Sequence, residues 1–381
     1  MTPKDMLTNR TFCPMPWTGL MYNFDGKVKN CIRSAGAIGD LKQDVIQDIL
    51  LGSNNISAQQ NIVNNQPVAT CHTCYDLEGD KSGFNIISDR IFYIRELKKV
   101  PTDTYQAGNF ELQTVDVRWS NLCNFSCVYC GPDFSSKWAA EINEYLDTPT
   151  AAQKQQFKNY IFENAHKLKH VYLAGGEPLL MKENEELLDL LKSTNPGVNL
   201  RINTNLSKVD TRVFEKICEF EHVHWTVSVE TIEQEFEYIR HGGRWLDFLD
   251  NLDTIRKLDH RISFNMLHFL LNYQSVFDCV DFLKSMGFHN NSYIIGAMID
   301  PLYLNIRHLP ESVLHSLRST LQDKINQHPG YLLEDSYRNM LAYLTTPFEK
   351  NLKQSFVDLS VLDQRRGLNS QEIFKELYKL A

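Results

Sequence analysis

From residue 114 onward, short runs of apolar and β-branched residues alternate with longer segments whose apolar positions recur at helical spacing. Each run is nearly continuous in apolar character, which is typical of strands buried on both faces of a parallel sheet. Helical segments such as NEELLDLLKS and QSVFDCVDFLKSMG separate the runs. The pattern predicts six βα repeats, with strands at residues 114–119, 170–174, 198–203, 222–229, 261–270 and 291–299.

Six such repeats predict an α/β fold with a partial (β/α)6 barrel, because a closed barrel of eight repeats takes about 250 residues. Residues 1–95 combine a hairpin pattern around Asp25 and Gly26 with a long polar stretch. We expect bound metal, rather than an apolar core, to stabilise this N-terminal module. Residues 96–112 are predicted as a linker, residues 113–309 as the partial barrel and residues 310–381 as a C-terminal helical extension.

The composition, 43% hydrophobic and 23% charged over 381 residues, is that of a globular protein. No apolar run reaches the length of a membrane span, and the polar start MTPKDMLTNR lacks the pattern of a signal peptide. We therefore expect a cytoplasmic protein without a membrane partner. The formal net charge of -8 argues against a nucleic-acid duplex as a partner.

The cysteines carry the strongest chemical signal. Nine are too few for a disulfide scaffold in a chain of this length, and clustered cysteines in a reducing compartment hold metal or perform chemistry. Cys218 and Cys279 lie on apolar faces of helical segments, where a thiol packs as a small hydrophobic group. The other seven form two sets, one of Cys13, Cys31, Cys71 and Cys74 and one of Cys123, Cys127 and Cys130.

The second set gathers three thiols in the stretch CNFSCVYC, directly after the first strand predicted for the barrel. A closed tetrahedral zinc site takes four ligands, whereas a 4Fe-4S cluster on three cysteines leaves one iron open. The spacing Cys-x-x-x-Cys-x-x-Cys resembles the signature of the radical S-adenosylmethionine (SAM) superfamily, in which such a cluster binds SAM. Tyr129 stands where that family usually has an aromatic residue.

The end of the second predicted strand resembles the same family. Gly175, Gly176 and Glu177 in the stretch AGGEPLL match its Gly-Gly-Glu-Pro turn. The resemblance implies that the Glu177 carboxylate accepts hydrogen bonds from the ammonium group of SAM, while glycine allows the backbone to approach a ligand closely. Taken alone, these residues are equally typical of an ordinary βα turn with an acidic cap.

Later strand ends supply the remaining candidates for SAM binding. The stretch INTNLS resembles the family's Thr-Asn-Gly element, which implies a role for Asn205, although Leu206 replaces the glycine. Ser228 and Glu230 stand where relatives bond the ribose hydroxyls, and both residue types also suit a helix cap. Arg240 resembles an arginine near the SAM carboxylate in relatives, and a cation also suits the end of a helix.

The first cysteine set has four thiols, with the predicted hairpin between Cys13 and Cys31 and a Cys-x-x-Cys pair at Cys71 and Cys74. This segment resembles the twitch and SPASM modules that bind an auxiliary cluster, although those modules normally follow the barrel. The resemblance implies a second 4Fe-4S cluster. Zinc is the alternative metal, because four cysteines at this spacing serve it equally well.

The resemblance implies an enzyme in which a reduced 4Fe-4S cluster cleaves SAM to methionine and a 5'-deoxyadenosyl radical, which abstracts hydrogen from a substrate. A reductant such as flavodoxin or ferredoxin is the implied protein partner. The expected substrate is a peptide or protein side chain, because relatives with auxiliary clusters often modify peptides. A small molecule such as a sugar, nucleoside or amino acid is one alternative, and a non-catalytic iron-sulfur protein that binds SAM as a sensor is another.

Overall fold

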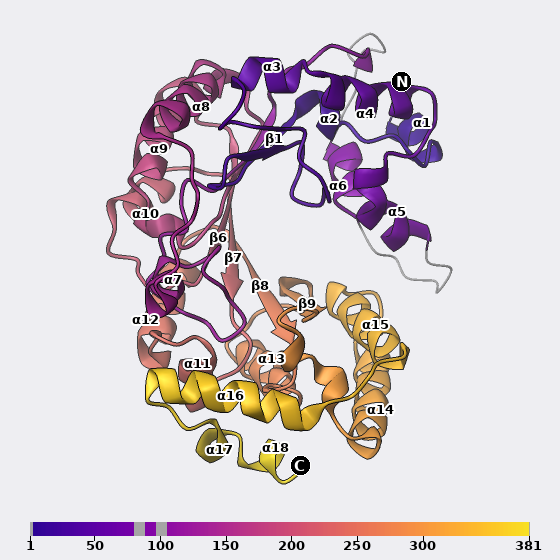
Figure 1. Cartoon of the computed structure of the whole chain (residues 1–381), viewed down its shortest axis with the longest axis vertical. Coiled ribbons are helices and arrows are strands. Elements are labelled where there is room, and N and C mark those ends of the chain that lie inside the picture. Colours follow the sequence, from indigo (N-terminus) through magenta and orange to yellow (C-terminus); the bar gives the residue numbers. More distant parts are fainter. Residues whose placement is uncertain (1–2, 80–87, 97–104, 381) are drawn as a thin grey trace. The chain divides into compact units, whose positions relative to one another are not determined.

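The computed structural model describes residues 3–79, 88–96 and 105–380, so residues 97–104 of the predicted linker lie outside the described part. The chain divides into two compact units. The first comprises residues 1–121, 146–202 and 210–223, and the second comprises residues 122–145, 203–209 and 224–381. Figure 1 labels helices and strands of both units where there is room.

The first unit is built on mostly parallel strands. Parallel pairings join β1 to β4, β4 to β5 and β5 to β6, while β2 and β3 add antiparallel strands at the β1 edge. The order is β3-β2-β1-β4-β5-β6. The strands are β1 Gly19–Tyr22, β2 Lys27–Lys29, β3 Gly39–Asp40, β4 Thr114–Val117, β5 His170–Leu173 and β6 Asn199–Thr204.

The helices of the first unit turn apolar faces inward. In α9, for example, Leu187, Leu188 and Leu191 are buried while the charged residues of the same helix face outward. Helices α9 and α10 lie side by side (Figure 1). The helices are α1 Pro3–Thr8, α2 Met15–Thr18, α3 Ile46–Leu50, α4 Ser53–Val63, α5 His72–Gly79, α6 Asp89–Glu96, α8 Ala151–Glu163, α9 Lys182–Thr194 and α10 Arg212–Ile217.

The second unit contains the parallel strands β7, β8 and β9, in that order. These strands are β7 Val223–Ser228, β8 Arg261–His268 and β9 Tyr293–Ala297. Helices α14 and α15 lie side by side, and α15 packs on β9 (Figure 1). The helices are α7 Ser136–Ile142, α11 Glu233–Ile239, α12 Trp245–Arg256, α13 Ser275–Ser285, α14 Glu311–Gln327, α15 Leu332–Thr345, α16 Leu352–Arg366, α17 Ser370–Ile373 and α18 Lys375–Tyr378.

The six strands predicted from the sequence are β4 to β9, and at least one helix follows each of them along the chain. The predicted α/β fold with a mostly parallel sheet and C-terminal helices is therefore confirmed. The hairpin around Asp25 and Gly26 is also confirmed, since β1 and β2 pair antiparallel. Gly26 has a φ of +91°, a conformation that glycine adopts without strain.

The N-terminal region has an apolar core of its own, so the expectation that metal alone would stabilise it is wrong. Trp17 stacks with Phe12 and meets Tyr105 edge-on, with ring centroids 5.3 Å apart for the second pair. The Trp17 indole N–H donates to the carbonyl oxygen of Gln106 at 2.8 Å. The buried cluster comprises Met6, Phe12, Trp17, Ile62, Val68, Ile94 and Tyr105.

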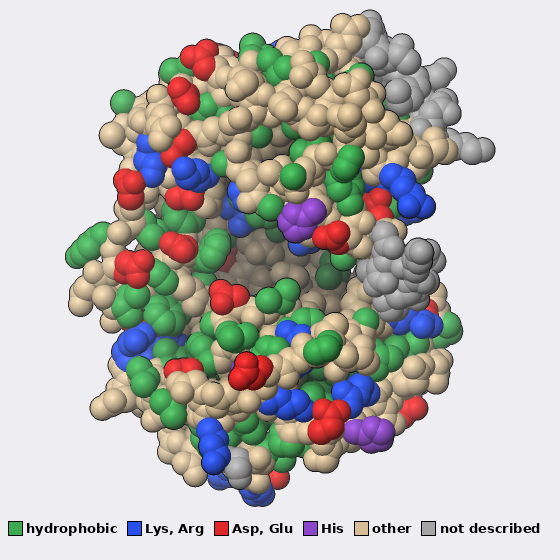
Figure 2. Space-filling model, turned by 45° about the vertical axis from the view of Figure 1, so that its right-hand side comes forward, with side chains coloured by type: hydrophobic (Ala, Val, Ile, Leu, Met, Phe, Trp, Pro, Cys, Tyr) green, Lys and Arg blue, Asp and Glu red, His purple; other side chains and the backbone are tan. Residues whose placement is uncertain are grey.

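In the described part of the chain, no helix combines the length and apolar character that a bilayer span requires. The face shown in Figure 2 carries charge of both signs, with lysine and arginine side chains interspersed among acidic and uncharged ones.

Adjacent positions of α4 test the N-terminal core. Ile62 is 1% exposed in the buried cluster, whereas Val63 is 57% exposed. We expect Ile62→Ala to lower the free energy of unfolding by about 2 to 5 kcal/mol through lost burial and a cavity. Val63→Ala should change it by less than about 0.5 kcal/mol. Urea unfolding of metal-free protein measures both, and equal effects of the two substitutions would show that this cluster does not stabilise the region.

Candidate functional site

The loop at residues 123–130 is held by backbone pairing within the second unit. The Ser126 N–H donates to the His241 carbonyl oxygen and the Val128 N–H to the Ile239 carbonyl oxygen, both at 2.8 Å. These two bonds flank Cys127 and follow the alternation of a strand, although the acceptors lie at and just beyond the end of α11. The middle cysteine of the triplet is therefore fixed by main-chain contacts on both sides.

The start of helix α7 is hydrogen-bonded to the same loop. Ser135 caps the helix by accepting the Trp138 N–H at 3.1 Å, and its hydroxyl donates to the Phe125 carbonyl oxygen at 2.5 Å. The Trp138 indole N–H donates to the Cys127 carbonyl oxygen at 2.9 Å. The cap of α7 and its first aromatic residue thus both hold the cysteine loop.

The three thiols of the loop lie close enough for their charges to interact. Burial raises the pKa of Cys127, and burial together with the charges of Cys127 and Cys123 raises the pKa of Cys130 to about 12. Such thiols lose their protons when a metal takes the thiolates. Three interacting thiols in one fixed loop are a donor set that fits the 4Fe-4S cluster implied by the resemblance.

Three candidate residues meet beside this loop. Arg240 donates to both carboxylate oxygens of Glu230, from Nε and Nη2, each at 2.7 Å, and the Tyr129 hydroxyl donates to Glu230 Oε1 at 3.0 Å. The Glu230 and Arg240 side chains are 2% and 3% exposed. Glu230 and Arg240 therefore bond each other. A direct contact of Glu230 with the ribose of SAM, and of Arg240 with the SAM carboxylate, stays a prediction. Ser228 is half-buried at the end of β7, where its backbone pairs with Asn265.

Asn205 contacts the cysteine loop directly. Its Nδ2 lies 3.7 Å from the Cys123 sulfur and 3.2 Å from Asn124 Oδ1. The next residue, Leu206, has a φ of 55°, although it carries a side chain that is fully buried. The chain thus keeps the left-handed backbone that favours glycine, the residue expected there from the family pattern. The Asn251 side chain holds this turn by donating to the Leu206 carbonyl oxygen at 2.9 Å.

The Gly-Gly-Glu-Pro turn belongs to the first unit, where it follows β5. Gly175 has a φ of +119°, and a Cβ atom there would lie 3.0 Å from the Ser120 carbonyl oxygen. Gly176 donates its N–H to the same oxygen at 3.4 Å. Glu177 is fully buried, and its Oε1 accepts the Leu179 N–H at 3.1 Å. The structure thus shows the acidic cap that the sequence offered as one interpretation of this turn. The positive φ and the close Ser120 carbonyl oxygen require glycine at position 175.

The four cysteines of the first set line one pocket in the first unit. Burial raises the pKa of each thiol, of Cys31 to about 12 and of Cys71 to about 11, and neighbouring thiols raise those of Cys13, Cys31 and Cys71 further. His72, between two of the cysteines, has a side chain that is 59% exposed, with its Nδ1 3.1 Å from Asp76 Oδ2.

Backbone amides of the first unit oppose this rise in pKa, because an N–H donated to sulfur stabilises the thiolate. Such donors to cluster sulfurs also tune iron-sulfur sites. By ligand type, four thiols suit an iron-sulfur cluster or zinc. The donors act from Met15 on Cys13, from Arg33 and Ser34 on Cys31, and from Arg90 on Cys74.

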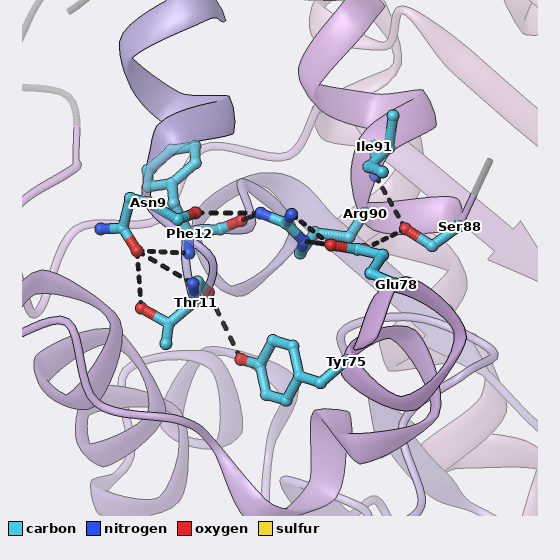
Figure 3. A network of polar contacts seen from close by, with 8 residues as sticks. All are labelled: Asn9, Thr11, Phe12, Tyr75, Glu78, Ser88, Arg90 and Ile91. Carbon is cyan, nitrogen blue, oxygen red and sulfur yellow. Dashed lines mark hydrogen bonds and ion pairs between the residues drawn. The ribbon is translucent and has the colours of Figure 1, made fainter. Parts of the chain in front are cut away.

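Figure 3 shows the polar network behind this pocket. The buried Arg90 guanidinium donates to the carbonyl oxygen of Phe12 at 2.7 Å and to that of Asn9 at 3.1 Å, and its Nε lies 2.9 Å from each carboxylate oxygen of Glu78. The Tyr75 hydroxyl donates to the Thr11 carbonyl oxygen at 3.3 Å. Helices α5 and α6 thereby hold the segment that leads into Cys13.

Sequence reasoning missed the side chains that support the two cysteine sets. Trp138 and Arg90 belong to no recognisable motif. Each donates to a backbone carbonyl oxygen, of Cys127 and of Phe12 respectively, and no regular sequence spacing links donor and acceptor. No three His, Cys, Asp or Glu side chains of the described residues converge closely enough to hold a single metal ion.

Comparison with known proteins places part of this chain in context. Residues 117–283 match the family model of the radical SAM superfamily. GTP 3',8-cyclase of Sulfurimonas denitrificans is 22% identical over 167 residues, 43% of this chain and 50% of that protein. GTP 3',8-cyclase of Aliarcobacter butzleri is 24% identical over 232 residues, 57% of this chain and 68% of that protein. The chain thus spans about half the length of the first of these relatives.

Two solved structures are similar at a greater distance. Native anSMEcpe with bound AdoMet and the Kp18Cys peptide has a TM-score of 0.42 and 14% identity, covering 56% of this chain and 62% of that chain. Streptococcus suis SuiB bound to S-adenosylmethionine has a TM-score of 0.41 and 14% identity, covering 71% of this chain and 63% of that chain. Likeness at this level says nothing about substrate.

The strained turn at Leu206 yields a prediction. Leu206→Ala should lower the free energy of unfolding by about 3 to 5 kcal/mol, because it leaves a cavity and keeps a side chain at positive φ. Leu206→Gly removes one more carbon but relieves about 1 kcal/mol or more of strain. We therefore expect the glycine variant to be the more stable of the two by about 1 kcal/mol in denaturant unfolding. A more stable alanine variant would contradict the strain.

Proposed function

Because residues 117–283 carry a radical SAM domain, we propose that the protein is a radical SAM enzyme whose cluster is held by Cys123, Cys127 and Cys130. The observation that supports this most directly is the loop, fixed by main-chain hydrogen bonds, that gathers three thiols inside the matched segment. When bound, a reduced 4Fe-4S cluster supplies the electron that cleaves SAM to methionine and a 5'-deoxyadenosyl radical, which removes hydrogen from a substrate. A flavodoxin or ferredoxin is the proposed reductant.

The chain's own residues would bind and orient SAM. In this proposal, Glu177 accepts N–H bonds from the SAM ammonium group while still capping the turn after its strand. Asn205 supports Cys123 from the neighbouring turn. Glu230, paired with Arg240, accepts the hydroxyl of Tyr129 and so holds this aromatic residue in place next to Cys130. The burial of Glu230 and Arg240 excludes water from this side of the loop at residues 123–130.

We propose that the pocket of Cys13, Cys31, Cys71 and Cys74 holds an auxiliary 4Fe-4S cluster, in a module of twitch or SPASM type. The four thiols that line one pocket and their backbone N–H donors support this assignment, and zinc is the alternative. The chemistry that an iron-sulfur cluster would supply there is one-electron transfer. Iron and zinc analysis of the same sample separates the two assignments.

The proposed substrate is a peptide or protein side chain, on the analogy with auxiliary-cluster enzymes drawn from the cysteine pattern. The alternative is a small molecule, and a purine nucleotide is its most specific form, because the curated relatives are named GTP 3',8-cyclase. Incubation with GTP is a defined probe. GTP consumption that matches the 5'-deoxyadenosine formed would establish the nucleotide alternative.

Alanine variants of the two cysteine sets test the proposed function. After anaerobic reconstitution, the wild-type protein should hold about eight irons and release 5'-deoxyadenosine from SAM when reduced. Cys127→Ala should abolish this release, because it breaks the proposed SAM-binding cluster. Cys74→Ala should lower iron to about four and leave release measurable, because Cys74 belongs to the other set.

Cys218→Ala is the matched control, because this half-buried thiol lies outside both sets and should keep the full iron content. Circular dichroism must show that each variant is folded, since metal loss can unfold a module. Release of 5'-deoxyadenosine by folded Cys127→Ala at the wild-type rate would refute the assignment of the triplet. A wild-type protein with SAM bound but no release under reductant would identify the non-catalytic alternative.

Glu177→Gln tests the carboxylate in the turn after β5. Glutamine keeps an oxygen that can accept the Leu179 N–H, so it removes the charge and preserves the cap. A lost charge-assisted hydrogen bond should weaken SAM binding about tenfold to a hundredfold, with iron content unchanged. Glu186→Gln, an exposed position with the same charge change, should bind SAM as the wild type does. Equal affinities for all three proteins, measured by calorimetry, would remove Glu177 from the site.

A further inference from the structure

The last residue of α16 places a buried cation behind the cysteine loop. The Arg366 side chain is 1% exposed, although it comes from the C-terminal helical extension. Its Nε donates to Glu141 Oε2 at 3.0 Å, whereas neither Nη1 nor Nη2 has a hydrogen-bond partner among the described residues. A guanidinium buried with two of its three nitrogens unbonded is unfavourable unless negative charge nearby compensates it.

Two routes connect this cation to Cys127. The first runs through Glu141, whose Oε1 accepts the hydroxyl of the fully buried Ser126 at 2.5 Å. The second runs through Trp138. The Arg366 guanidinium lies 5.2 Å from the centroid of the Trp138 ring, and the Trp138 indole N–H donates to the Cys127 carbonyl oxygen. Both routes end at Cys127 or the residue before it.

Arg366 and Arg240 are both buried cations of the second unit, and they differ in how protein groups bond them. Arg240 is already neutralised by two bonds to Glu230. Arg366 bonds Glu141 through Nε alone, and its Nη1 and Nη2 have no hydrogen-bond partner among the described residues.

We propose that Arg366 is a positioning residue that holds the cysteine loop through Glu141 and Trp138 and raises the reduction potential of the cluster bound there. This inference rests on the proposed function, since it assigns the C-terminal helix a role at the proposed SAM-binding cluster. Uptake of one electron from a low-potential reductant adds one negative charge to the cluster. A buried cation stabilises that charge more strongly than an exposed one, because the surroundings screen it less.

The test is a redox titration of the reconstituted protein, with the reduced cluster followed by electron paramagnetic resonance. It is carried out in the Cys74→Ala background, so that only the SAM-binding cluster contributes a signal. Arg366→Gln should shift the midpoint potential to more negative values. Arg366→Lys keeps the positive charge and should therefore have a potential close to that of the parent protein. Arg365→Gln is the matched control, because this neighbour is exposed and also lies beside Trp138, at 5.3 Å. Its potential should stay at that of the parent protein.

Glu141→Gln separates electrostatics from loosened packing. Removing this negative charge leaves Arg366 in place and should shift the potential to more positive values, opposite to Arg366→Gln. Shifts of the same sign in both variants, or equal shifts in Arg365→Gln and Arg366→Gln, would overturn the proposal. An unchanged potential in an iron-loaded Arg366→Gln protein would overturn it while leaving the proposed function intact. A parent protein that takes up no cluster at all would overturn both.

Discussion

The structure of the proposed site depends on one constraint, the main-chain pairing that fixes Cys127 between Ser126 and Val128. Because both amides donate to carbonyl oxygens at and beyond the end of α11, the loop cannot shift without breaking two hydrogen bonds. The pairing also buries the thiol, which raises its pKa and makes the thiolate unfavourable without a bound cation. A fixed loop whose central thiol is buried favours a bound metal over reaction of that thiol in solvent.

Several side chains from distant parts of the second unit then converge on this loop. Trp138 and Ser135 hold it from α7, and Asn205 reaches it from the turn after β6. The ion pair of Glu230 and Arg240 orients Tyr129. These contacts are hydrogen bonds between buried or half-buried groups, whose loss costs more than that of exposed ones. The loop is consequently held by the fold before any cofactor binds.

The four-cysteine pocket follows a different design. Its segment has an apolar core around Trp17 and a buried ion pair between Arg90 and Glu78, so the fold of the region does not rest on metal alone. Bound metal would add stability to a segment that already packs. Loss of one thiol there is accordingly compatible with a folded chain, which is what makes the two cysteine sets separable by mutation.

The sequence was informative where the pattern is local. The strands β4 to β9, the hairpin at Gly26 and the grouping of the cysteines all follow from spacing within short stretches. The parallel pairing of β1 with β4 could not be predicted, because it joins short strands far apart in the chain. The N-terminal core was missed for a related reason, since its members are scattered from Met6 to Tyr105 without a repeat. Arg366 and Glu141 also meet only through the fold.

The claim that the triplet leaves an open iron for SAM is tested most directly by electron–nuclear double resonance. The reduced, reconstituted protein is mixed with SAM that carries ¹⁵N in its amino group. The account predicts a ¹⁵N coupling to the cluster in the wild-type protein, because the amino group would bind the iron that lacks a cysteine. A reduced cluster that shows no ¹⁵N coupling at saturating SAM would contradict it.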